Sequence, residues 1–136
     1  MTSVEINYLA VLVSAVIIFI LGGLWYSPVL FAKQWISAVN KSEEEIKKGS
    51  KPTDYVLAFI QGLISSYILA IFVYWAQAAS PGSGAWVGFM CWFGFAGSTT
   101  LVHNIFAGRP SKLWLIDSGH TLVSFIASGI ILAVWK

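Results

Sequence analysis

Both histidines, the only arginine and an aspartate of the chain lie between residues 103 and 120. Asp117 and His120 are three residues apart, so they share one face if the segment is helical. Imidazole ordinarily changes charge near neutral pH, and a neighbouring carboxylate tunes that change, which suits proton handling. We therefore interpret this stretch as a candidate site for protons, ions or a lipid head group closed by Arg109.

The candidate site draws on three apolar segments. If residues 84–106 and 113–135 form a helical hairpin, His103 lies at about the depth of Asp117. Gln61 lies at a similar depth in a separate segment. The candidate polar cluster consists of Gln61, His103, Asn104, Arg109, Asp117 and His120.

A structural interpretation accounts for the same residues. Asp117 could pair with Arg109 or Lys112 across the short turn, while His103 and His120 hydrogen-bond between helices, since polar side chains commonly join membrane helices. Such a clip predicts no cavity beside Asp117. A water-accessible cavity joining the cluster would favour a functional role.

Metal, cofactor and catalytic signatures are missing from the sequence. The cluster lacks the tight ligand spacing of zinc motifs such as His-Glu-x-x-His, so no metal site is predicted. The sequence has no Gly-x-Ser-x-Gly elbow, phosphate-binding glycine loop or dinucleotide fingerprint. Its basic residues form no array typical of nucleic-acid binding. We therefore expect neither an enzyme nor a cofactor nor a nucleic-acid partner.

Composition indicates that these residues are positioned by membrane-spanning helices. Of the 136 residues, 57% are hydrophobic and only 10% are charged, whereas soluble domains have about 25% charged residues. Four apolar stretches, about residues 6–26, 55–76, 84–106 and 113–135, are each long enough to cross a bilayer. We predict an all-α fold, a four-transmembrane-helix bundle running up-down-up-down, as a single domain over residues 1–136.

Residues 27–54 form the longest connection, and the sequence Ser80-Pro81-Gly82-Ser83 predicts a turn between the second and third spans. Phe31, Trp35 and Val39 recur every four residues, which predicts a short amphipathic helix lying in the membrane interface. Its polar side is predicted to carry Lys33, Gln34, Ser37 and Asn40. Ser42 to Glu45 has the spacing of a capping box, and Gly49 is placed to end the helix that follows.

The basic residues predict the orientation of the bundle. Five of the eight lie in residues 27–54 and two more in the turn 107–112. The positive-inside bias makes this side cytoplasmic and puts both termini outside, in a plasma (inner) membrane. Trp25, Trp35 and Trp114 lie near span ends, where we interpret them as interface anchors.

Small residues at four-residue spacing predict close helix contacts, within the chain or between copies. These predicted packing residues are Gly84, Gly88, Gly94, Ser98, Ser124 and Ser128. We expect the lipid bilayer as one partner and a homo-oligomer or a larger membrane complex as another.

Four sequence elements resemble the DUF1761 family of small membrane proteins. They are Asn7-Tyr8 opening the first span, Leu24-Trp25-Tyr26-Ser27-Pro28 closing it, Gly108-Arg109-Pro110, and Leu113-Trp114-Leu115-Ile116. The tryptophan-tyrosine-serine-proline element is the most specific of them, and the resemblance covers nearly the whole chain. It implies a four-helix membrane protein and supplies no activity.

Two functional hypotheses follow. The first is a non-enzymatic scaffold or accessory subunit acting through helix packing, motivated by the small-residue faces and short loops. The alternative is a small transporter or channel whose polar cluster, between the second, third and fourth spans, handles protons or ions.

Overall fold

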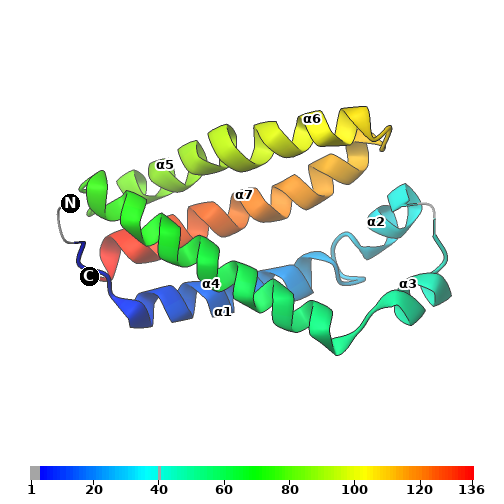
Figure 1. Ribbon diagram of the computed structural model, residues 1–136, viewed down its shortest axis with the longest axis horizontal. Coiled ribbons are helices and arrows are strands. Elements are labelled where there is room, and N and C mark those ends of the chain that lie inside the picture. Colours follow the sequence, from blue (N-terminus) through cyan, green and yellow to red (C-terminus); the bar gives the residue numbers. More distant parts are fainter. Residues whose placement is uncertain (1–3, 40) are drawn as a thin grey trace.

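The computed structural model describes residues 4–39 and 41–136, and every regular element in these residues is a helix. Over this described part the chain forms four long helical segments, with two short helices between the first and the second (Figure 1). The long segments are α1 (Tyr8–Trp25), α4 (Pro52–Trp75), the joined α5 (Pro81–Cys91), η1 (Trp92–Gly97) and α6 (Ser98–Phe106), and α7 (Ser111–Val134). Each segment is long and apolar enough to cross a membrane. The predicted all-α class with four candidate spans is therefore confirmed.

Helix starts differ from the predicted boundaries for local reasons. α1 begins after Asn7, whose side-chain oxygen accepts hydrogen bonds at 3.1 and 3.2 Å from two backbone N–H groups of the first turn. α4 and α5 begin earlier than predicted, at Pro52 and Pro81. Proline is favoured there because its missing N–H has no partner to lose in a first helical turn. The sequence Ser80–Ser83, predicted as a turn, is instead the capped start of α5.

The tightest packing joins α5 to the second half of α7 through glycines. A Cβ atom at Gly84 would lie 2.3 Å from the carbonyl oxygen of Gly129, and one at Gly88 would lie 2.2 Å from that of Phe125. No side chain larger than hydrogen fits between backbones this close. We call this contact the glycine seam.

The other predicted packing residues divide in two. Ser124 and Ser128 are buried in α7, at 2% and 1% exposure. Gly94 and Ser98 are exposed, and a Cβ at Gly94 would meet nothing within 4 Å. Contact through Gly94 and Ser98 with another copy or protein stays a prediction.

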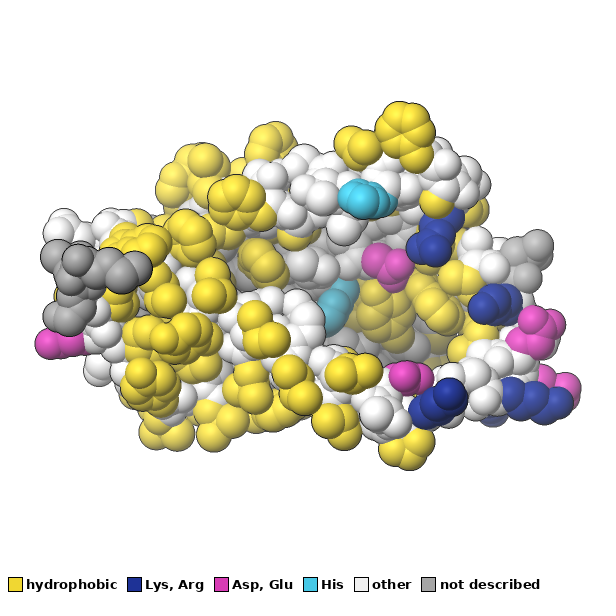
Figure 2. Space-filling model, in the orientation of Figure 1, with side chains coloured by type: hydrophobic (Ala, Val, Ile, Leu, Met, Phe, Trp, Pro, Cys, Tyr) yellow, Lys and Arg dark blue, Asp and Glu magenta, His cyan; other side chains and the backbone are white. Residues whose placement is uncertain are grey.

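Small buried residues also line the meeting place of α1, α4 and α7. These residues include Ala10, Ser14, Ala15, Ser66, Ala70 and Ala133. Their size lets the helices approach closely, whereas many large apolar side chains remain exposed around the bundle (Figure 2). That distribution fits lipid as the surrounding solvent.

The connection between α1 and α4 folds into α2 (Ala32–Val39) and α3 (Glu43–Gly49). In α2 the polar side chains are exposed while Trp35, Ile36 and Val39 are half-buried. A helix therefore lies where an amphipathic one was predicted, and its place in a membrane interface stays a prediction.

The predicted cap and end of α3 are both present. Ser42 Oγ accepts a hydrogen bond from the backbone N–H of Glu45 at 3.1 Å, and the helix ends at Gly49. Asn40, predicted on the polar side of α2, lies outside the described residues.

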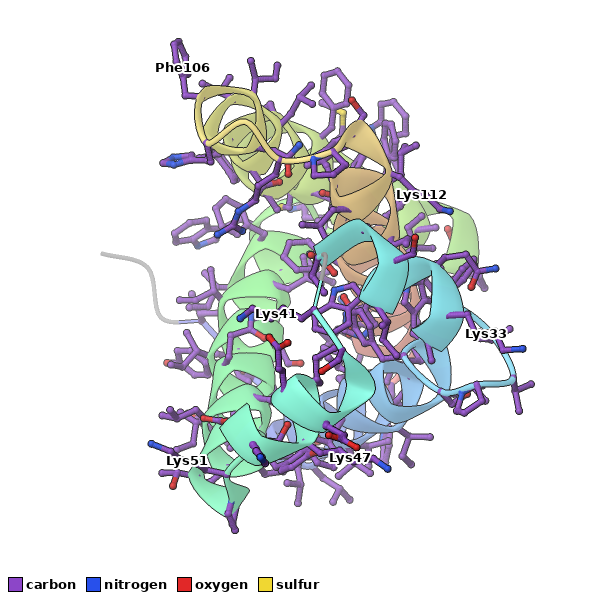
Figure 3. The ribbon with its side chains drawn as sticks, turned by 90° about the vertical axis from the view of Figure 1, so that its right-hand side faces the viewer. Lys33, Lys41, Lys47, Lys51, Phe106 and Lys112 are labelled. Carbon is purple, nitrogen blue, oxygen red and sulfur yellow. The ribbon has the colours of Figure 1, made fainter. Side chains whose placement is uncertain are left out.

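One end of the bundle carries most of the basic side chains. Figure 3 looks onto this end and shows Lys33, Lys47, Lys51 and Lys112 near its edge and Lys41 closer to its middle, on α2, α3, α7 and the segments beside them. We call it the basic end. It is also where α1 ends and α7 begins (Figure 1).

Candidate functional site

Asp117 is half-buried in α7, and its carboxylate accepts a hydrogen bond from a phenol. Tyr26, at the end of α1, donates its Oη proton to Asp117 Oδ1 at 2.6 Å. Burial, followed by this hydrogen bond and the charge of Asp117, raises the pKa of Tyr26 above its ordinary value. The hydrogen bond that the described residues show for this carboxylate comes from Tyr26, and its pairing with Arg109 or Lys112 across the turn stays a prediction.

A cavity of about 450 Å³ lies beside Asp117, between α6 and the first half of α7. We call it the polar cleft. It is lined by Trp92, Ala96, Thr100, His103, Asn104, Ala107, Arg109, Trp114, Asp117, Ser118 and Thr121. Figure 2 shows a hollow on this face of the molecule, with histidine and acidic side chains in it and basic ones near its edge. Four members of the candidate polar cluster thus share one cavity, which a simple clip did not predict.

These four members have different surroundings. Asn104 is buried and donates its amide to the carbonyl oxygens of Arg109 at 3.1 Å and Pro110 at 3.3 Å, so it holds the turn before α7. His103 and Arg109 are exposed at the cleft, and Asp117 is half-buried. The hydrogen bonds of Asn104 therefore give it a structural role. The ionisable side chains of His103, Arg109 and Asp117 are the candidates for chemistry at the cleft.

Gln61 and His120 lie apart from the cleft. They line a separate cavity of only about 50 Å³. Gln61 donates to Ser65 Oγ at 2.7 Å, and His120 Nε2 lies 3.4 Å from Ser124 Oγ. Thr121 lines both cavities. The predicted cluster thus divides into two neighbouring groups.

A third cavity, of about 520 Å³, reaches Asp117 from the basic end. We call it the aromatic pocket. It is lined by Tyr26, Ala32, Trp35, Ile36, Ile46, Tyr55 and Asp117. The rings of Tyr26 and Trp35 meet edge to face, with centroids 6.0 Å apart. Tyr26 was expected only in the element that closes the first span, and Trp35 only as an interface anchor, so neither was predicted in a site.

Three tryptophans fix the walls of these cavities. Trp25 Nε1 donates to the carbonyl oxygen of Ile116 at 2.8 Å, and Trp92 Nε1 donates to that of Ser118 at 3.0 Å. Trp114 Nε1 donates to Thr100 Oγ1 at 3.1 Å and to a backbone carbonyl of η1. The indoles predicted as interface anchors near span ends, Trp25 and Trp114, therefore bond inside the bundle.

The π-helical turn η1 sets which face of α6 meets α7. A π turn holds one extra residue, so it shifts the helical phase after it. Continuing the α-helical spacing from Gly88 would turn Val102 and Phe106 toward α7. Instead Val102 is 51% and Phe106 is 87% exposed, while Thr100 lines the polar cleft and Asn104 is buried. The extra residue thus brings polar side chains to the cleft.

Metal ligation finds no support at this site. In residues 4–39 and 41–136 no three side chains of histidine, cysteine, aspartate or glutamate come together as metal ligands. The conceivable set of His103, Asp117 and His120 is divided between two cavities.

Comparison with known proteins gives one match. A family model described as "Protein of unknown function (DUF1761)" matches residues 9–133. No curated protein and no solved structure matches the chain.

Proposed function

Because the chain belongs to the DUF1761 family of proteins of unknown function, we propose its role from geometry: a proton-conducting or proton-coupled membrane transporter centred on Asp117. The observation that carries this proposal is that Asp117 lines both the polar cleft and the aromatic pocket. An ionisable group at membrane depth costs several kcal/mol unless it has a partner or a role. A carboxylate between two cavities is positioned to exchange protons with both.

The residues beside Asp117 extend this chemistry. His103 lines the polar cleft and is exposed, so it can take a proton from one side. Tyr26 donates to the carboxylate from the other side. Arg109 keeps a fixed positive charge at the cleft, which disfavours free passage of other cations there.

The proposed orientation follows from charge. With the basic end cytoplasmic, the aromatic pocket opens toward the cytoplasm, and both termini lie outside a plasma (inner) membrane. The chain acts in this proposal as a non-enzymatic protein, with its four segments passing up-down-up-down.

Proton flux into liposomes tests the proposal. The full chain is reconstituted with a trapped pH dye, and an imposed pH gradient should dissipate faster than in protein-free vesicles. Asp117→Asn should slow this flux at least about tenfold, since an amide side chain cannot take up and release a proton as a carboxylate does. Glu44→Gln, which removes an exposed carboxylate of α3, is the matched control and should leave the flux unchanged. Wild-type flux equal to empty vesicles, or to Asp117→Asn, would overturn the proposal.

A scaffold or subunit role remains the second candidate. It is supported by Gly94 and Ser98, which are exposed on η1 and α6 with open space at the glycine. Small residues of this kind let a second helix approach closely in lipid. Sizing in mild detergent tests this role: a monodisperse monomer without a co-purifying partner would count against it.

A further inference from the structure

We propose that the aromatic pocket binds a small organic cation, with Asp117 as its counter-ion. This inference deepens the proposed function, on which it rests, by naming the class of solute to which proton movement is coupled. It stands on the lining of the pocket, the free capacity of the carboxylate and the exposure of the nearby lysines.

The lining has the chemistry of an ammonium site. Tyr26, Trp35 and Tyr55 supply three aromatic rings to one cavity of about 520 Å³. A cation over the face of an aromatic ring is attracted by the ring quadrupole, most strongly at tryptophan. The aliphatic side chains of Ile36 and Ile46 complete the lining and suit the alkyl groups of an organic cation.

Asp117 is the single acidic group among the lining residues, and none of them is basic. Its hydrogen bond with Tyr26 uses Oδ1. An ionised carboxylate has about four acceptor positions on its two oxygens. The carboxylate therefore keeps capacity for a cationic ligand, and an anion in the pocket would meet an uncompensated negative charge.

The size and ligand set disfavour an inorganic cation. Calcium and magnesium ions take about six or more oxygen ligands. The pocket offers one carboxylate and the phenols of Tyr26 and Tyr55. An organic cation is more weakly hydrated than these metal ions, so it needs fewer oxygen ligands and gains from the apolar walls.

The lysines of the basic end do not block this assignment. Figure 3 shows Lys33, Lys47 and Lys51 near the edge of this end and Lys41 closer to its middle. All four are exposed, so salt screens their charge over about 8 Å at physiological ionic strength. The carboxylate inside the pocket is half-buried and is screened less.

Two sources could supply this ligand chemistry, a free organic cation or the ammonium head group of a phospholipid. Binding of tetraphenylphosphonium to the full chain in an uncharged detergent probes the first source. The same titration in nanodiscs of phosphatidylcholine, compared with phosphatidylglycerol, probes the second, because a bound choline head group should compete with the added cation.

We expect saturable binding that Asp117→Asn weakens about tenfold or more. Trp35→Leu should weaken it about threefold, the range of a cation–π contact. Glu44→Gln and Trp86→Leu are the matched controls, since both residues are exposed away from the pocket lining. Neither control should change the affinity.

Ala32→Phe keeps the proposal falsifiable if the aspartate variant misfolds. Ala32 lines the pocket on α2, and its methyl side chain has no charge or hydrogen-bonding group. A phenyl group there should fill the cavity and abolish binding while the protein keeps its elution volume and helicity. Competition confined to phosphatidylcholine nanodiscs would identify a lipid head group as the natural ligand and support the site.

Absence of saturable binding in detergent and in both nanodiscs would overturn the inference, as would equal affinity in wild type, Asp117→Asn and Ala32→Phe. The outcome is separable from the flux experiment. Binding without proton flux would sustain this site and overturn the proposed function, whereas flux without binding would sustain the proposed function and overturn this site.

Discussion

The two halves of α7 are packed by opposite means. In the second half, Gly129 lies against α5 backbone, so that a Cβ there would be 2.2 Å from the carbonyl oxygen of Gly84. In the first half, Gly119 faces the ring of Trp25, with a Cβ-to-ring distance of 3.0 Å. Glycine thus allows close contact with backbone at one end of α7 and with a tryptophan ring at the other.

This difference explains where the two cavities beside Asp117 lie. Backbone-to-backbone packing leaves no space, whereas an indole spaces two helices apart and anchors them through one N–H bond. The polar cleft and the aromatic pocket both flank the tryptophan-spaced half, beside Asp117. Spacing by tryptophan rings thus leaves room for a solute beside Asp117.

Among the substitutions that test this difference, Gly88→Ala should lower the unfolding free energy most. Its Cβ would lie 2.2 Å from the backbone oxygen of Phe125, so α5 and α7 must separate. We expect a loss of more than about 3 kcal/mol in unfolding free energy, at or beyond the usual upper range of overpacking. Unfolding by sodium dodecyl sulfate in mixed micelles, followed by circular dichroism, measures it. Gly94→Ala, which meets nothing within 4 Å, is the control and should be neutral or slightly stabilising.

Gly97→Ala should cost less, about 1–3 kcal/mol. Its Cβ would come within 2.7 Å of the ring of Trp92, and a side chain gives way more easily than backbone. Trp92→Phe in the same chain should relieve part of this loss, which a double-mutant cycle in the same assay would detect. If the two changes are additive, the ring of Trp92 is not what occupies the space beside Gly97.

Tyr26→Phe should have the smallest effect, seen best at alkaline pH. The pKa of Tyr26 is raised in the folded protein, while in the unfolded chain it is about 10. Above pH 10 the unfolded phenol loses its proton and the folded one keeps it, so wild-type stability falls as pH rises. We expect wild type to lose about 1 kcal/mol more than Tyr26→Phe between pH 9 and 11, after discounting for solvent screening of a half-exposed group. Parallel curves for the two proteins would refute the assignment.

Hydropathy and capping residues predicted the elements well, because those signals are local. The run of apolar residues defines each span, and Ser42 defines the start of α3 through its own hydrogen bond. The predicted turn at residues 80–83 was wrong, because a Ser-Pro-Gly-Ser sequence is compatible with both a turn and a capped helix start.

The site was predictable only in part, because its assembly depends on long-range packing. The position of His103 beside Asp117 followed from the hairpin. The bond from Tyr26 to Asp117 joins residues 91 positions apart, and no spacing rule connects them. The contribution of Trp35 likewise requires knowing that α2 folds back against α7.

The extra residue in η1 also constrains how the chain can change in length. Removing any one residue of Trp92–Gly97 would restore a continuous α-helix and rotate everything after it by about 100°. Thr100 and Asn104 would then swing away from α7 while the glycine seam stayed in register. Insertions and deletions in the third segment are therefore limited by the face that α6 turns toward α7 as well as by bilayer thickness. A deletion there would need a compensating insertion between the glycine seam and the polar cleft.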